Sequence, residues 1–130
     1  MNDRFLLDTN IVIALIAKDS SVERGLASAE KVYVPSLVLG ELYFGARASA
    51  QKDRNLARID EFAAANAVLV PDVATAREYG ILKAALRAKG RLIPENDMWI
   101  AAIARQHSLT LITRDAHFRE IEGLTTEDWR

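Results

Sequence analysis

The sequence predicts an α/β protein of three layers, in which a central, mainly parallel sheet of four to five strands has helices on both faces. Three observations lead to this prediction. Short apolar runs alternate with longer segments whose apolar residues recur at helical spacing. The short runs lack the polar alternation of a half-exposed strand, as is typical of strands buried in a parallel sheet. Polar residues follow where these runs end, at the edge where open α/β sheets place their sites.

The N-terminal part of the chain is expected to form a strand and two helices. Residues 5–7 are the first apolar run, and residues 11–17 continue as an apolar helix for which Thr9 or Asn10 would serve as the N-cap. Residues 22–29 follow as a short amphipathic helix. A strand followed by helices that pack on the sheet is the order expected for an alternating α/β fold.

The second strand and the helix after it carry two glycines that need a reason. The strand over residues 32–34 is ended by a proline, and Ser36 is expected to cap a helix that runs to about residue 48. Gly40 and Gly45 each weaken this helix by roughly 1 kcal/mol relative to Ala. Close packing against another helix or a ligand would explain them.

The rest of the chain continues the alternation. The remaining elements are expected over residues 51–66 (helix), 68–70 (strand), 73–89 (helix), 97–107 (helix), 109–113 (strand) and 116–121 (short turn or helix). Gly90 fits the C′ position that ends the long helix, and a terminal edge strand or tail leads to Trp129. With no linker and no internal repeat, residues 1–130 are expected to form one domain.

The composition excludes several classes of protein. Cysteine is absent, which excludes disulfides, thiolate catalysis and zinc sites with cysteine ligands. The 17 Lys and Arg against 18 Asp and Glu give a net charge of -1, unlike the basic character of a typical nucleic-acid binder. The apolar runs are too short to cross a membrane, and no signal peptide is recognisable, so a cytoplasmic protein is expected.

Lone carboxylates lie in the most apolar segments. Asp8 is the only charged residue within residues 5–17, Glu41 within residues 32–46, and Asp97 within residues 96–104. A carboxylate taken out of water without a partner costs several kcal/mol or becomes protonated. These three acids, with Asp115 just past the end of a strand, therefore suggest a cluster neutralised by a cation.

Each acid taken alone also fits a structural role. Asp8 or Asp115 could cap the segment that follows it, Glu41 could point to solvent, and Asp97 could favour the positive end of its helix. The four together, all expected near one end of a parallel sheet, favour a metal site over four separate structural roles.

Oxygen ligands of this kind indicate Mg²⁺ or Mn²⁺ rather than zinc. The chemistry typical of such a pocket is phosphoryl transfer, in which the metal lowers the pKa of a bound water and neutralises developing charge. Thr9, Asn10 and Thr113 lie beside the acids in the sequence and could orient the ligands or the water. Ser36 is better explained as a helix cap.

Other polar residues give weaker signals. His107 and His117 lie in no recognisable catalytic motif and are interpreted as surface or packing residues. Lys89, Arg91 and Arg114 are expected in loops near the site and could contact a polyanion, although ordinary solvated charges explain each of them as well.

Five short motifs combine the acids with their neighbours: Leu-Leu-Asp8-Thr-Asn, Ser36-x4-Glu41-Leu-x2-Gly45, Asn96-Asp97-x2-Ile-Ala-Ala, Leu-Ile-Thr113-Arg-Asp115 and His-Phe…Ile-x-Gly-Leu…Trp. In this order they resemble the motifs of the PIN-domain family, and within it those of the VapC-type toxins. They span almost the whole chain. Each motif is short, but the ordered set is specific.

The resemblance implies a fold, an activity and partners. It implies the PIN-like form of the three-layer fold and Mg²⁺-dependent cleavage of RNA by the toxin of a type II toxin–antitoxin pair. Asp8, Glu41, Asp97 and Asp115 match the four acids that surround Mg²⁺ in the family. A cognate antitoxin, a homodimer and a larger toxin–antitoxin assembly are the partners that it implies.

Three other functions remain open from the sequence. One is a non-catalytic module whose acidic pocket binds an antitoxin or a nucleic acid, and another is a nuclease directed at DNA. A phosphoacceptor of the receiver type also uses acids and Mg²⁺, but it needs a late lysine, and no Lys follows Asp97.

Overall fold

The computed structural model describes residues 3–130, and its five strands form one parallel sheet in the order β3-β2-β1-β4-β5. The strands are β1 (Arg4–Leu7), β2 (Lys31–Pro35), β3 (Ala67–Leu69), β4 (Thr110–Ile112) and β5 (Thr126–Glu127). The expected sheet of four to five strands is therefore confirmed, with its carboxyl ends at one edge. β1 lies at the centre, and the chain crosses over on either side of it.

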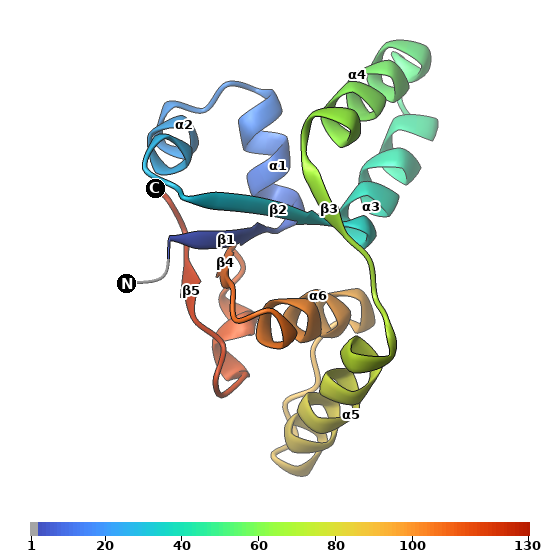
Figure 1. Ribbon diagram of the computed structural model, residues 1–130. Helices are drawn as coiled ribbons and strands as arrows, with labels where there is room; N and C mark the ends of the chain where they lie inside the picture. The colour runs from blue at the N-terminus through green and yellow to red at the C-terminus, as the bar shows by residue number, and fades with distance from the viewer. Residues whose placement is uncertain (1–2) are drawn as a thin grey trace.

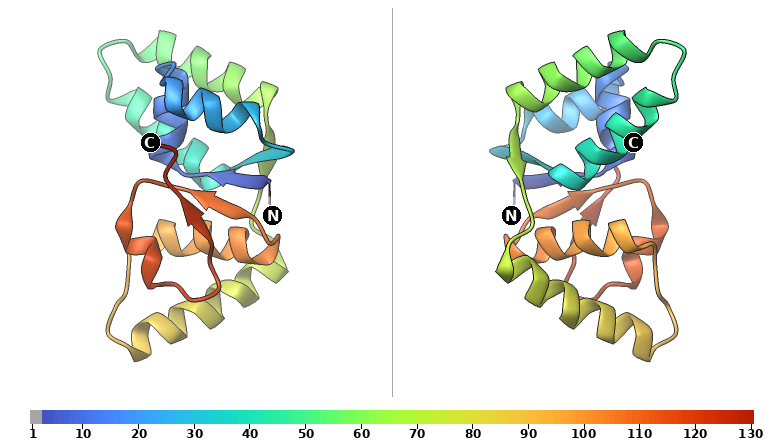
Figure 2. Two further views of the ribbon diagram at one scale, coloured as in Figure 1. Left: turned by 90° about the vertical axis from the view of Figure 1, so that its left-hand side faces the viewer. Right: turned by 90° about the vertical axis from the view of Figure 1, so that its right-hand side faces the viewer.

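Helices cover both faces of the sheet, as Figures 1 and 2 show. The helices are α1 (Thr9–Ile16), α2 (Ser20–Ala27), α3 (Ser36–Arg47), α4 (Lys52–Ala65), α5 (Val73–Ala88), α6 (Glu95–Gln106) and the 3-10 helix η1 (Ala116–Glu120). The first four lie on one side of the sheet and α5 and α6 on the other. The expected three-layer α/β architecture is confirmed. No helix within residues 3–130 is long and apolar enough to span a bilayer.

The core is densest around β1, β4 and α6. Leu6 and Leu7 of β1 and Leu111 and Ile112 of β4 have no exposed surface, and the α6 residues from Ile100 to Ala104 are likewise buried. Burial of apolar side chains is the main driving force for folding. An acid at the edge of this core must therefore find a polar partner or remain poorly solvated.

Two helix N-termini differ from the sequence prediction. Asp8, rather than Thr9 or Asn10, is the N-cap of α1, and its carboxylate accepts a hydrogen bond from the Thr9 N–H at 2.8 Å. Pro35, rather than Ser36, precedes α3, and no side chain caps that helix. The rigid φ of Pro35 sets the turn into α3, so α3 begins without a side-chain cap.

The glycines have different roles from one another. Gly90 has a φ of +68° after the end of α5, which confirms the expected C′ position. A Cβ on Gly40 or Gly45 would meet nothing within 4 Å, so close packing within residues 3–130 does not explain these two glycines. A Cβ on Gly25 would instead overlap the indole of Trp129, which also packs edge-to-face on Phe5 at 5.0 Å.

Candidate metal centre

The four acids predicted from the sequence come from four elements that meet at the carboxyl edge of the sheet. Asp8 directly follows β1, Asp115 follows β4, Asp97 lies in the first turn of α6 and Glu41 in the middle of α3. Their charges act on one another. Burial is the main cause that raises the pKa of Asp8 and of Asp97; the charges of Asp97 and Asp115 add to the rise for Asp8, and those of Glu41 and Asp115 add to it for Asp97. The structure therefore brings the four predicted acids into one electrostatic cluster.

Asp8 is the most buried acid of the cluster, with 2% of its surface exposed. Besides the Thr9 N–H on Oδ1, the Thr113 hydroxyl donates to Oδ2 at 2.7 Å. Burial raises the pKa of Asp8 to about 6, and these two hydrogen bonds only partly oppose the effect. Within residues 3–130, no Lys or Arg forms an ion pair with Asp8 or with the other three acids. A cation would relieve this poorly solvated charge.

Glu41 is held by two neighbours from other helices. The Thr9 hydroxyl donates to Oε2, and the side-chain amide of Asn96 donates to Oε1. Glu41 thereby connects α1, α3 and α6 at the rim of the cluster. Asn96 was not predicted as a site residue, because its role depends on a contact with a residue 55 positions away in the sequence.

The predicted accessory residues also lie around the acids. Thr9 contacts Glu41, and Thr113 contacts Asp8, as described above. Asn10 accepts a hydrogen bond from the Arg114 N–H at 3.2 Å, which connects the start of α1 to the segment after β4. Each of the three thus orients an acid or a segment that carries one.

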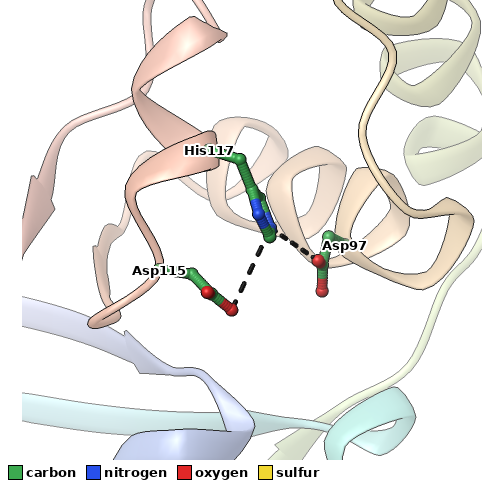
Figure 3. Close-up of side chains that lie close together, drawn as sticks. All are labelled: Asp97, Asp115 and His117. Atoms are coloured by element: carbon green, nitrogen blue, oxygen red, sulfur yellow. Dashed lines mark hydrogen bonds and ion pairs between the residues drawn. The ribbon is translucent and has the colours of Figure 1, made fainter.

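His117 is the residue that the sequence interpretation missed (Figure 3). Its Nε2 lies 2.7 Å from Asp97 Oδ2 and 4.0 Å from Asp115 Oδ2. The interpretation of His117 as a surface or packing residue is therefore incomplete, because the partly exposed imidazole also contacts the predicted acids. Burial raises the pKa of Asp97, and the hydrogen bond with His117 opposes that rise. The signal in the sequence was the spacing of Asp115 and His117, two residues apart just past a buried strand.

Two of the three basic residues expected near the site are engaged within the chain. Arg114 donates to the backbone carbonyls of Asp128 and Trp129 and lies 3.6 Å from the carboxylate of Asp19. Lys89 contacts Glu120, through both its backbone oxygen and its carboxylate. The positions of the Arg114 and Lys89 side chains are thus explained by contacts within the protein, without a bound polyanion. Arg91 is exposed.

Trp99, although close to Asp97 in the sequence, has a packing role. Its ring stacks on that of Tyr79 from α5, with centroids 4.1 Å apart and planes inclined by 10°. Stacking of this kind adds to the burial that holds two helices together. Trp99 therefore joins α6 to α5.

The cluster has the composition and spacing of a divalent-cation site. One ligand atom from each of Asp97, Asp115 and His117 lies within 4.8 Å of the other two. Asp8 and Glu41 do not belong to this group of three, and their connection to it is electrostatic, because Asp97 and Asp115 act on Asp8 and Glu41 acts on Asp97. Carboxylate oxygens are ligands for Mg²⁺ and Mn²⁺, and an imidazole nitrogen is a ligand for transition ions such as Mn²⁺ and Fe²⁺. These residues fit a bound metal ion.

Comparisons with known proteins identify the family of this chain. A family model described as PIN domain matches residues 5–124. The chain is 37% identical over 129 residues to Ribonuclease VapC2 of Haemophilus influenzae and 40% identical over 129 residues to the tRNA(fMet)-specific endonuclease VapC of Shigella flexneri. In both cases 97% of this chain and 98% of the relative are covered.

Solved structures resemble the fold over its whole length. The crystal structure of DNA-bound VapBC from Salmonella typhimurium contains a chain that is 33% identical, with a TM-score of 0.90 and complete coverage of both chains. That of VapBC2 from Rickettsia felis, bound to a DNA fragment from the promoter, matches at 30% identity and a TM-score of 0.88, covering 97% of this chain and 98% of that one.

Proposed function

Because this chain belongs to the PIN-domain family, we propose that it is a metal-dependent endoribonuclease, the toxin of a type II toxin–antitoxin pair. The observation that carries the proposal is that Asp8, Glu41, Asp97 and Asp115 meet at one edge of the sheet, where no Lys or Arg of residues 3–130 forms an ion pair with them. The relatives named as ribonucleases and as a tRNA-specific endonuclease make RNA the substrate class. The chain acts as one nuclease domain in the cytoplasm.

Asp8, Asp97 and Asp115, with Glu41, are the residues that would hold Mg²⁺ or Mn²⁺. When bound, such an ion supplies an activated water and neutralises the charge that develops on the scissile phosphate. We assign Asp8 as a central ligand because it is buried and directly follows the middle strand β1. Glu41 lies at the exposed rim, where it can also accept a proton from a water molecule.

The surrounding polar residues orient these acids. The hydrogen bonds from the Thr9 N–H and the Thr113 hydroxyl favour the charged form of Asp8 and fix the orientation of its carboxylate oxygens. Thr9 and Asn96 fix both oxygens of Glu41 through their hydrogen bonds. Such fixed orientation of ligands and bases is what makes an active site effective before the substrate arrives.

The antitoxin has a suitable surface beside the site. An apolar groove of about 340 Å³ runs between α1, α3 and α4, and it includes Ile13, Gly45 and Ile59, with Glu41 and Thr9 at its polar part. Phe44, next to it in the chain, is 79% exposed. The related crystal structures are of VapBC complexes. We therefore assign this groove to the cognate antitoxin, in a complex built on a homodimer of this chain.

Cleavage of a labelled RNA tests the nuclease proposal. The wild-type protein should cut RNA with Mg²⁺ or Mn²⁺ and stop in excess EDTA, and Asp97→Asn should lose at least about a hundredfold in rate. Asp53→Asn, which changes an exposed acid in the first turn of α4, is the matched control and should keep full activity. Undiminished cleavage by Asp97→Asn, or by the wild type in EDTA, would refute the proposal.

A further inference from the structure

We infer that His117 is a direct ligand of the metal ion in this centre and that its imidazole makes the centre prefer Mn²⁺ to Mg²⁺. The inference rests on the proposed function for the presence of a metal ion. It goes beyond that function in two respects. It adds a nitrogen ligand to the four acids, and it states which ion the centre selects.

The distances fit a shared ion. In octahedral geometry, ligand atoms about 2.1 Å from one ion lie roughly 3 Å apart when adjacent and roughly 4 Å apart when opposite. His117 Nε2 lies 2.7 Å from Asp97 Oδ2 and 4.0 Å from Asp115 Oδ2. Figure 3 shows the ring directed toward both carboxylates from η1. The nitrogen is therefore close enough to both carboxylates to share one ion with them, once the ion replaces its hydrogen bond with Asp97.

The position of His117 is fixed by its neighbour in the chain. Phe118 has no exposed surface and anchors η1 in the core, with its ring 5.0 Å from the imidazole. The His117 side chain is consequently 34% exposed, directed toward the acids rather than away from them. A histidine with only a surface role would not need this orientation.

The chemistry of the nitrogen then decides between ions. Mg²⁺ strongly prefers oxygen ligands and keeps several of its waters, whereas imidazole is a good ligand for transition ions. Three or four carboxylates alone would accept Mg²⁺ and Mn²⁺ similarly. One imidazole added to them favours Mn²⁺.

The alternative is that His117 only positions Asp97. In that case the 2.7 Å hydrogen bond between them persists in the metal-bound protein, and the ion contacts oxygen atoms alone. The two arrangements differ in a direct observable, since only the first places a nitrogen nucleus one bond away from the metal.

Pulsed electron paramagnetic resonance on the Mn²⁺-loaded protein tests the inference. The chain has only two histidines, His107 and His117, so a protein prepared without a polyhistidine tag gives an unambiguous signal. We expect a ¹⁴N modulation in the wild type and in the control His107→Gln, and none in His117→Gln. Calorimetric titration should show that the ratio of Mn²⁺ to Mg²⁺ affinity falls at least about tenfold in His117→Gln.

Each outcome supports or overturns the inference. Wild-type protein that binds Mn²⁺ without a ¹⁴N modulation overturns it, even if His117→Gln fails to fold. An unchanged affinity ratio in a folded His117→Gln does so as well. A ¹⁴N modulation in a protein that does not cut RNA would support His117 as a metal ligand and refute the proposed nuclease function. Cleavage of RNA by a protein whose Mn²⁺ ion shows no ¹⁴N modulation would refute His117 as a metal ligand and support the proposed nuclease function. Absence of any binding of Mn²⁺ or Mg²⁺ would refute both.

Discussion

Asp8→Asn should make the metal-free protein more stable at neutral pH, although it removes a proposed ligand. The side chain is 2% exposed, and burial raises its pKa from the ordinary 3.8 to about 6. The charged carboxylate is thus poorly solvated in the folded protein until a cation binds. Asn keeps the shape of the side chain and loses the charge, so the unfavourable burial of a carboxylate disappears.

The magnitude follows from the shift of the pKa. A difference of roughly two pKa units means that the charged form of Asp8 destabilises the folded protein by about 3 kcal/mol at pH 7. The amide makes weaker hydrogen bonds with the Thr9 N–H and the Thr113 hydroxyl, which offsets roughly 1 kcal/mol. We therefore expect a net gain of about 2 kcal/mol, or a rise of the Tm by roughly 5–10 °C.

The pH dependence has a definite sign. The folded-state pKa of Asp8 is higher than its unfolded value, so metal-free native protein takes up a proton more readily than the unfolded chain does. Its free energy of unfolding should therefore fall as the pH rises from about 4 to about 6. Asp97, whose pKa burial also raises, acts in the same direction. Asp8→Asn should show a flatter profile.

Urea unfolding in EDTA at pH 5 and pH 7.5, then with Mn²⁺ or Mg²⁺, measures these effects. Added metal should stabilise the wild type and the control Asp53→Asn and have little effect on Asp8→Asn. Two results together would refute the reasoning. Asp8→Asn would have a lower free energy of unfolding than the wild type at pH 7.5 in EDTA, and added metal would raise that free energy as much in Asp8→Asn as in the wild type.

Three further substitutions test separate contacts. Thr113→Val removes the hydroxyl bonded to Asp8 and should weaken metal binding about 10–100-fold by calorimetry; unchanged affinity would contradict that role. Gly25→Ala places a Cβ against Trp129 and should lower the free energy of unfolding by about 1–3 kcal/mol in urea, whereas a neutral result would show that the C-terminal segment simply moves. Phe44→Ser should weaken antitoxin binding at least about tenfold while RNA cleavage persists; equal binding would place the antitoxin elsewhere.

Much of the site could be predicted because its residues interrupt apolar segments. Asp8, Glu41 and Asp97 are the only charges in runs that become the core, and the strand order of an α/β sheet brings the ends of β1 and β4 together. The strands and helices were predictable for the same reason, since their apolar spacing is regular. Their limits in the structure differ from the expected ones by at most a few residues.

The remaining features depend on contacts that local patterns do not contain. His117 enters the site only because Phe118 is buried under η1, and Asn96 only because α6 lies beside α3. The cap of α1 was misassigned because Asp8 serves both as helix cap and as part of the acidic cluster. Arg114 and Lys89 looked available for a polyanion because their internal partners are distant in the sequence.

The central claim is that the acids at the carboxyl edge of the sheet hold the ion that cuts RNA. A crystal structure of the wild-type protein with Mn²⁺, at a concentration that supports cleavage, tests it most directly through the anomalous scattering of the ion. We predict an anomalous peak about 2.2 Å from carboxylate oxygens of Asp8, Asp97 and Asp115. A protein that cleaves RNA under these conditions but shows no peak among these residues would contradict the claim.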